Sequence, residues 1–313
     1  MSILFTFPGQ GAQRAGMLHA LPDHPEVART LAESAEVLGM EPLSLDTQEA
    51  LASTIAVQLC LMIAGVAMGR TLVAHGVRPD MVAGFSIGAY PAAVIANVLD
   101  YQDAVSLVAR RAQLMEQAYP KGYGMAAITG LDCCRLEPLI ARAHSMATPV
   151  YLANLNAPKQ MVIAGADAAL QTVMQLALDN GAAKAERLAV SVPSHCPLFD
   201  AAAEDMRSAF NGVALRQPSV TYLSSNAARA LRVPARIADD LASNMARQVH
   251  WAETAELAWE CGARLALEMP SGAVLTKLTT SAFADGLAVC CDKQRIEPLL
   301  ATCARARAEI KHH

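Results

Sequence analysis

The chain has 313 residues, of which 53% are apolar and 17% charged, and its net charge is −4. This composition provides material for a large buried core, and the absence of a basic patch argues against nucleic-acid binding. Aromatic residues make up only 4% of the chain. We therefore expect a core built from Ala, Leu, Val and Met, as in helix-rich α/β proteins.

Two uncharged stretches, residues 50–69 and 81–99, are long enough to span a membrane. The first contains Gln58 and the second contains Ser86 and Asn97, so both are expected to belong to the core. The N-terminus lacks the basic start and the long apolar run of a signal peptide. We predict no membrane association.

None of the eight cysteines forms a C-x-x-C motif, and two pairs are directly adjacent. Such spacing suits neither a zinc site nor a disulfide framework. We expect reduced, mostly buried thiols in a cytoplasmic protein that uses no metal and no cofactor.

The first part of the chain alternates strands and helices. A short apolar run ends in the tight loop Pro8-Gly9-Gln10-Gly11 and reads as a buried strand. Alternation of this kind predicts a parallel sheet covered by helices on both faces. The expected strands are 3–7 and 81–83, and the expected helices are 54–75, 86–98 and 101–119.

After residue 122 the order of elements becomes β-α-β-β-α-β, which is typical of a ferredoxin-like unit. We therefore predict an α/β-hydrolase-like large domain, residues 1–122 and 198–313, that carries an inserted ferredoxin-like small domain, residues 123–197. The small domain is expected to contain strands 125–129, 150–154, 160–164 and 185–192 and helices 135–145 and 168–180. The large domain resumes with further strands at 220–224 and 265–269.

The clearest chemical motif is Gly84-Phe85-Ser86-Ile87-Gly88, a G-x-S-x-G between a strand and a helix. That context is the one the nucleophile elbow requires, because the glycines leave room for a sharp turn that exposes the serine hydroxyl. The dipole and free N–H groups of the following helix point at the hydroxyl. We predict that Ser86 is a nucleophile.

A serine nucleophile needs a base and donors for its oxyanion. His195, between two prolines at the end of the small domain, and His75, before the elbow strand, are both candidate bases; His75 also suits a structural role at a helix end. The backbone N–H groups of Gln10 and Ile87 are natural oxyanion donors. Cys196, beside His195, is an alternative nucleophile.

Five separated motifs together resemble the malonyl-CoA:acyl carrier protein transacylase family. They are Phe7-Pro8-Gly9-Gln10-Gly11-Ala12-Gln13, the serine elbow, Arg111, Ser194-His195, and Asn154-Leu155-Asn156-Ala157-Pro158-Lys159-Gln160 with the Val162-Ile163-Ala164-Gly165 that follows it. They occur in the family's order along essentially the whole chain.

The resemblance implies an α/β-hydrolase-like domain with a ferredoxin-like insertion, and a set of roles. Ser86 is the nucleophile, His195 the base, Arg111 the ligand of the malonyl carboxylate and Gln10 the residue of the oxyanion loop. The third partner of the histidine is an amide or carbonyl oxygen, which aligns with Asn244. Asn156 is expected to bind substrate, and the partners are malonyl-CoA and an acyl carrier protein with a phosphopantetheine-type thiol.

Arg111 can also be judged by its chemistry. The helix that bears it follows the elbow helix, so one of its faces reaches the cleft, and a guanidinium pairs with a carboxylate through two parallel hydrogen bonds. Such a contact would select malonyl over acetyl groups. Without the resemblance, Arg110 and Arg111 also fit a simple solvated pair of charges.

Three departures from the family pattern lead to a narrower hypothesis. Phe85 and Ile87 flank the serine, Ala89 replaces an acidic residue, and Glu268-Met269-Pro270-Ser271-Gly272 stands in place of Gly-Pro-Gly. We interpret these departures as a sign that the chain is the malonyltransferase (epsilon) subunit of malonate decarboxylase. Other decarboxylase subunits would then be partners as well. The alternative is a transacylase of fatty-acid or polyketide synthesis.

Two other classes remain open. A serine thioesterase or esterase would need an acid between Ser86 and His195 in the chain, for which Asp132 and Asp167 are candidates. The second class is a transacylase that has lost its activity and only docks a carrier protein. The intact Ser86 and His195 argue against this class.

Overall fold

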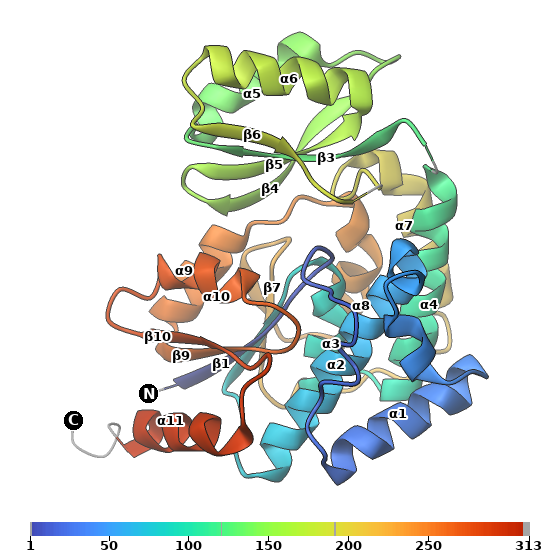
Figure 1. Cartoon of the computed structure of the whole chain (residues 1–313), viewed down its shortest axis with the longest axis vertical. Coiled ribbons are helices and arrows are strands. Elements are labelled where there is room, and N and C mark those ends of the chain that lie inside the picture. The colour runs from blue at the N-terminus through green and yellow to red at the C-terminus, as the bar shows by residue number, and fades with distance from the viewer. Residues whose placement is uncertain (1, 120, 191, 309–313) are drawn as a thin grey trace.

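The computed structural model describes residues 2–119, 121–190 and 192–308, and its larger unit is built around a six-stranded sheet (Figure 1). The strand order is β10-β9-β1-β2-β7-β8, and all neighbours are parallel except β7 and β8. The strands are β1 (Ser2–Phe7), β2 (Met81–Gly84), β7 (Thr221–Ser224), β8 (Arg229–Leu231), β9 (Ala263–Glu268) and β10 (Leu287–Cys290).

Alternate residues of β1 enter different cores, because successive side chains of a strand point to opposite faces. Ile3, Phe5 and Phe7 pack with the helices on one face, while Leu4 packs with those on the other. Burial on both faces explains the continuous apolar run at the N-terminus. The first face is covered by α2 (Thr54–Ala74), α3 (Ala89–Ile95), α4 (Tyr101–Ala118), α8 (Pro234–Ser243) and α11 (Ile296–Ala308), and the second by α9 (Trp251–Glu260) and α10 (Val274–Thr280).

In the described part of the chain, α2 is the one helix long and apolar enough to cross a membrane. Its most apolar window is 89% buried within the molecule. It lies against α1 (Pro25–Leu38) and α4, and α7 (Asp200–Ala209) packs on α4 in turn. The helix is therefore part of the core, as the polar residue in its sequence indicated.

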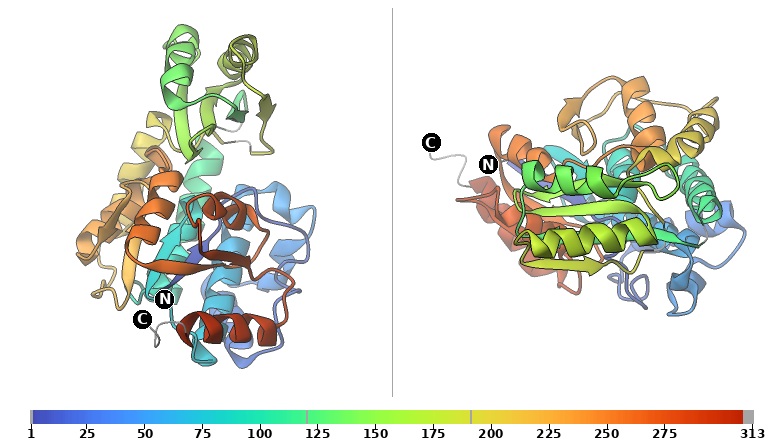
Figure 2. Two further views of the ribbon diagram at one scale, coloured as in Figure 1. Left: turned by 90° about the vertical axis from the view of Figure 1, so that its left-hand side faces the viewer. Right: turned by 90° about the horizontal axis from the view of Figure 1, so that it is seen from above.

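The smaller unit is a four-stranded antiparallel sheet of order β4-β5-β3-β6, with two helices on its outer face (Figure 2). This order and the sequence β3-α5-β4-β5-α6-β6 confirm the predicted ferredoxin-like unit. Its elements are β3 (Tyr123–Thr129), α5 (Cys133–Ala143), β4 (Val150–Ala157), β5 (Gln160–Ala166), α6 (Asp167–Asp179) and β6 (Lys184–Arg187).

The predicted α/β architecture is confirmed, with differences at the ends of elements. The elbow helix, predicted over residues 86–98, is the short 3-10 turn η3 (Ser86–Gly88) followed by α3, and it ends before Asn97, whose φ is +62°. Strands β8 and β10 were not predicted, and β6 is shorter than the predicted 185–192. The domain division at 123–197 remains a proposal; β3 begins at Tyr123 and the 3-10 turn η4 (Pro197–Phe199) begins at Pro197.

Candidate active site

Ser86 lies on the sharp turn between β2 and α3, with a φ of +56°. Positive φ is strained for a serine and marks a position that the surrounding structure enforces. The two motif glycines make the turn possible. A Cβ on Gly84 would lie 2.1 Å from the backbone of Gly88, and one on Gly88 would lie 2.0 Å from the carbonyl oxygen of Phe7. The serine therefore stands on a nucleophile elbow.

The imidazole of His195 reaches this serine. Its Nε2 is 2.9 Å from Ser86 Oγ, and its Nδ1 is 2.8 Å from the backbone oxygen of Asn244 and 3.1 Å from that of Arg247. A carbonyl oxygen only accepts, so Nδ1 carries the proton and Nε2 is left to accept the serine proton. His195 has a φ of +65°, and its N–H donates to the carbonyl of Met245.

The partner of His195 is thus a backbone carbonyl of η5 (Asn244–Ala246), and no carboxylate takes that place. Asp132 caps α5 by accepting from the N–H of Arg135, and Asp167 forms an ion pair with Arg187. Neither acid contacts the histidine, so the triad that a hydrolase of this chain order needs is not formed. Burial, and the nearby Arg111 charge, lower the pKa of His195 to about 4.

Arg111 is fully buried on α4 and directed at the serine. Its Nη2 is 3.3 Å from Ser86 Oγ and 2.9 Å from Oδ1 of Asn244, and its Nη1 donates to Oε1 of Gln58 at 2.6 Å. All of these partners are neutral. Burial lowers the pKa of Arg111 to about 10, so at neutral pH the site holds an unneutralised cation.

Asn244 contacts Ser86, His195 and Arg111. Its backbone oxygen accepts from His195, its Oδ1 accepts from Nε and Nη2 of Arg111, and its Nδ2 donates to the backbone oxygen of Ser86 at 3.2 Å. The side chain is 1% exposed. The side-chain amide of Asn244 therefore contacts both the elbow and the guanidinium, and it fixes the position of one relative to the other.

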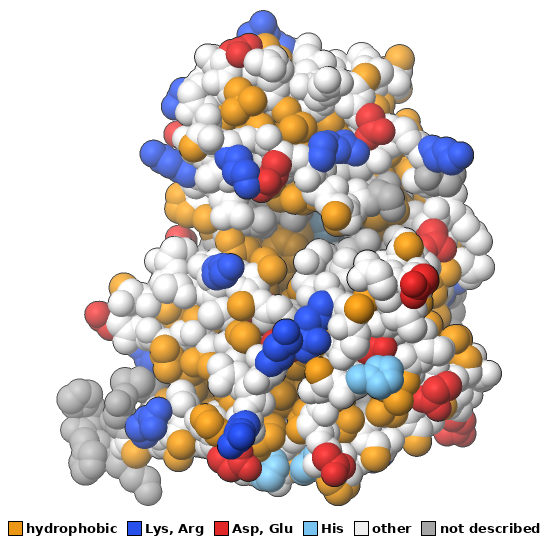
Figure 3. Space-filling view, in the orientation of Figure 1, with side chains coloured by type: hydrophobic (Ala, Val, Ile, Leu, Met, Phe, Trp, Pro, Cys, Tyr) orange, Lys and Arg blue, Asp and Glu red, His pale blue; other side chains and the backbone are white. Residues whose placement is uncertain are grey.

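A small cavity of about 50 Å³ opens beside Ser86. Gln10, from the loop after β1, lines it, and the N–H of Gln10 forms no hydrogen bond within the described residues. Figure 3 shows the surface hollowed between the two units. The other lining residues are Phe85, Met125, Asn154, Leu188, Val190, Ser194 and His195. Ile87 is buried directly after the serine, and the role of its N–H as an oxyanion donor stays a prediction.

The structure does not bring every predicted residue to this cavity. Asn156 is buried but does not line it, whereas Asn154, two residues earlier on β4, does. The thiol of Cys196 points at the carbonyl of Pro193, and burial raises its pKa to about 12, so it is a poor nucleophile. His75 lies at the C-terminus of α2, with its ring against that of His24.

Sequence reasoning did not assign a role to Gln58 or to the carbonyl of Arg247. Gln58 is 1% exposed and stands in an otherwise apolar part of α2. A buried polar side chain needs a partner, so its position in an apolar helix was the signal that could have identified it. A backbone carbonyl gives no such signal, because every residue has one.

Comparisons with known proteins identify the family. Residues 4–301 match the family model described as the acyl transferase domain. The chain is 37% identical over 280 residues, 87% of its length and 89% of the relative's, to a malonyl CoA-acyl carrier protein transacylase of Haemophilus influenzae. A relative of the same name from Bacillus subtilis is 33% identical over 88% of this chain and 89% of its own.

Solved structures give the same result. The crystal structure of FabD from Acinetobacter baumannii superposes with a TM-score of 0.92 at 33% identity, covering 97% of this chain and 99% of that one. A malonyl-transacylase in complex with its type II polyketide acyl carrier protein gives 0.88 at 34% identity, over 94% and 97%.

The fold and the site define a class, that of acyl transferases with an elbow serine. Within this class, the chain belongs to the malonyl CoA-acyl carrier protein transacylase family.

Proposed function

We propose that the protein transfers a malonyl group from malonyl-CoA to the prosthetic thiol of an acyl carrier protein, through an ester on Ser86. The observation that carries this proposal is Arg111, a fully buried guanidinium with only neutral partners, 3.3 Å from the serine hydroxyl. Burying an unpaired charge is costly, and an acyl group that ends in a carboxylate would neutralise it.

In the first half-reaction, Ser86 Oγ attacks the thioester carbon and His195 Nε2 takes the hydroxyl proton. The N–H groups of Gln10 and Ile87 stabilise the oxyanion. The carbon–sulfur bond then breaks, and the CoA sulfur leaves with the proton from His195. The product is a malonyl ester of Ser86 whose carboxylate is paired with Arg111.

In the second half-reaction the carrier's thiol gives its proton to His195 and attacks the ester carbon. The bond between carbon and Ser86 Oγ breaks, and the serine recovers the proton. One thioester replaces another, so the exchange needs no energy source. The malonyl group leaves on the carrier.

The acceptor that we propose is a carrier protein of fatty-acid or polyketide synthesis. The relatives reported above are named as transacylases of acyl carrier protein, and one structural relative was solved with a polyketide carrier. The malonate decarboxylase hypothesis came from Phe85 and Ile87, Ala89 and the 268–272 segment, and none of these relatives supports it. The cytoplasmic location stays a prediction.

The test of the serine is a covalent adduct. Incubation with radiolabelled malonyl-CoA should leave one malonyl group on the protein, and Ser86→Ala should abolish it. Ser194→Ala, which changes a hydroxyl lining the same cavity, is the matched control and should keep the adduct. Label retained by Ser86→Ala would disprove the assignment.

The test of the acceptor compares two holo carrier proteins, one from fatty-acid synthesis and one from malonate decarboxylase. We expect faster transfer to the first, measured as malonyl carrier by mass spectrometry. A clear preference for the decarboxylase carrier would overturn this part of the proposal and would leave the malonyl ester on Ser86 intact.

A further inference from the structure

Two sets of contacts lie on either side of Gln10 in its loop. At its start, Gly9 lies so close to the elbow that a Cβ there would be 2.8 Å from the Phe85 carbonyl oxygen and 3.4 Å from Ser86 Cβ. Gln10 follows at the apex of a turn closed by the N–H of Ala12 donating to the carbonyl of Gly9. We therefore expect contacts on the far side of this turn to influence where the N–H of Gln10 points.

On that far side, Arg14 forms a two-pronged ion pair with Asp292. Its Nη2 is 2.7 Å from Oδ1 and its Nε is 3.1 Å from Oδ2, and the same Oδ2 accepts from the N–H of Gly272 at 3.0 Å. Asp292 therefore ties together three chain segments that are far apart in sequence. Two parallel hydrogen bonds fix orientation as well as distance.

The second contact comes from the segment that departs from the family's Gly-Pro-Gly. Ser271, which is 0% exposed, donates its hydroxyl to the carbonyl of Ala12 at 2.5 Å. Gly272 has a φ of +80°, and a Cβ there would lie 3.3 Å from the same carbonyl oxygen. The departure thus places a hydroxyl against the loop of Gln10.

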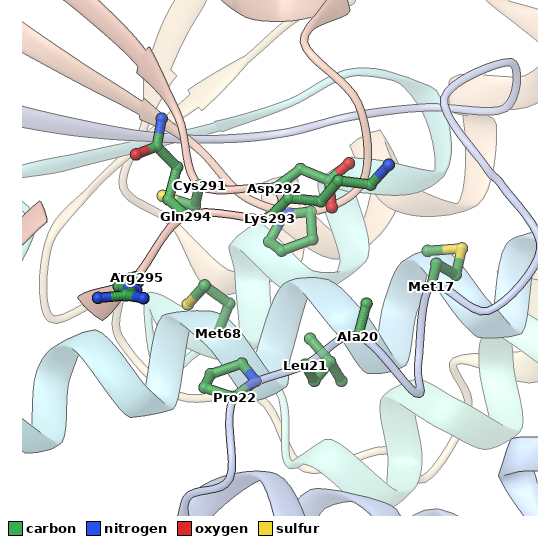
Figure 4. Close-up of a pocket in the computed structure, with 11 residues that line it drawn as sticks. Met17, Ala20, Leu21, Pro22, Met68, Cys291, Asp292, Lys293, Gln294 and Arg295 are labelled. Atoms are coloured by element: carbon green, nitrogen blue, oxygen red, sulfur yellow. The ribbon is translucent and has the colours of Figure 1, made fainter.

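These contacts lie beside a cavity. A cavity of about 160 Å³ lies between Met17, further along the same loop, Met68 of α2, and residues 291–295 (Figure 4). Asp292 borders this cavity, as Figure 4 shows. Met17 and Leu18 are packed in the main core, and Ala12 lies partly against it. On the side nearer Gln10, the polar contacts of Asp292 and Ser271 add to this packing.

We propose that Asp292 and Ser271 are positioning residues for the reaction: acting through Arg14 and Ala12, they hold the loop so that the N–H of Gln10 meets the oxyanion. This inference rests on the proposed function, which supplies the identity of the acyl group. The need for an oxyanion donor follows from the elbow geometry of Ser86. Neither residue touches the reacting atoms.

The experiment compares two reactions of the serine position. Acylation by malonyl-CoA, or by p-nitrophenyl acetate, forms an oxyanion and needs Gln10. Alkylation by iodoacetamide of a protein carrying Ser86→Cys forms none. The variants are Asp292→Ala, Arg14→Gln and Ser271→Ala, with Asp167→Asn as a control that removes an exposed ion-pair charge in the small unit.

We expect the rate constant of acylation to fall about tenfold in each variant, less than the roughly 100- to 1000-fold loss of an oxyanion donor. KM for malonyl-CoA and the alkylation rate should not change. Because Arg14 and Asp292 act as a pair, the double variant should lose little more than either single one.

Equal loss of acylation and alkylation would show a general structural defect and overturn the proposal, as would unchanged acylation. If Asp292→Ala does not fold, Arg14→Gln tests the same contact. Failure of the wild-type protein to form a malonyl adduct would contradict the proposed function, and p-nitrophenyl acetate would still test the loop.

Discussion

At the scale of single residues, the site is organised around a buried cation. Arg111 donates to Gln58 and Asn244, whose amide oxygens orient the guanidinium without neutralising it. An ammonium group could not make the same forked contacts. The neutral partners leave the charge available for a substrate carboxylate, so we expect this residue to select the acyl group.

Arg111→Ala should therefore lower kcat/KM for malonyl-CoA by about 10- to 100-fold, the value of a charge-assisted contact of about 1.5–3 kcal/mol. Discrimination against acetyl-CoA should fall with it. Arg110→Ala, which removes an exposed guanidinium next to it in the chain, is the matched control. Competition between the two thioesters measures the ratio, and unchanged selectivity would contradict the role.

His195 leads to a pH prediction. Burial first, and then the Arg111 charge, lower its pKa to about 4, whereas a free histidine titrates near 6.5. The base is therefore neutral across pH 5–8, and acylation by p-nitrophenyl acetate should be flat there and fall only towards pH 4. The unfolded chain binds this proton more tightly, so the contribution to stability falls as the pH drops from about 6.5 to 4.

Arg111→Gln should raise the pKa of His195, because it removes the like charge. The acid limb of the acylation profile should move to higher pH by a measurable amount. An unmoved limb would mean that burial alone sets the pKa. The profile is measured with the neutral ester, since the carboxylate of malonyl-CoA titrates in the same range.

The residues that sequence could identify are those with a local pattern. Ser86 stands in a motif whose glycines are required by backbone contacts, and His195 is framed by prolines. The oxygen that orients His195 belongs to the backbone of Asn244. The polar partners of Arg111, which lies on α4, come from α2, η3 and η5. Contacts between distant segments have no signature in spacing.

At the scale of elements, the elbow depends on the close approach of β1, β2 and α3. Gly88 has helical backbone angles that alanine tolerates, φ −58° and ψ −16°, but a Cβ there would lie 2.0 Å from the oxygen of Phe7. Residue 88 is therefore restricted to glycine by lack of space beside β1, and not by its backbone conformation.

We predict that Gly88→Ala destabilises the protein by several kcal/mol, because backbone must move to admit the methyl group. Gly212→Ala is the matched control: its φ is +84° and the site is open, so strain of about 1 kcal/mol is expected. Urea unfolding measures both. Similar midpoints for the two variants would contradict the clash.

Elements with a complete local pattern were predictable, and those that depend on a distant partner were not. The strand β1 could be predicted from its apolar run, and the turn between β4 and β5 from its own residues. In contrast, β8 has three residues and pairs only with β7, and β10 is a half-buried edge strand beside β9. Their strand conformation comes from the sheet they join, which a short window of sequence does not contain.

At the scale of the whole molecule, the two units are joined by backbone hydrogen bonds at the edge of the small sheet. The N–H of Leu155 donates to the carbonyl of Val249 at 2.7 Å, and that of Val249 donates to Ala153 at 2.9 Å. Gln248 adds a side-chain bond to the carbonyl of Leu152. These contacts fix β4, and with it Asn154, over the cavity beside Ser86.

This junction should protect the malonyl ester from water, because it holds the small unit over a serine that is only 7% exposed. Gln248→Ala removes one bond of about 1 kcal/mol, and hydrolysis of the isolated malonyl-enzyme should rise by up to about fivefold. Gln175→Ala, on the exposed side of α6, should leave hydrolysis unchanged. Release of radiolabelled malonate measures the rate. If both variants hydrolyse the ester like the wild type, the joined edge of the sheet does not control the access of water to the ester.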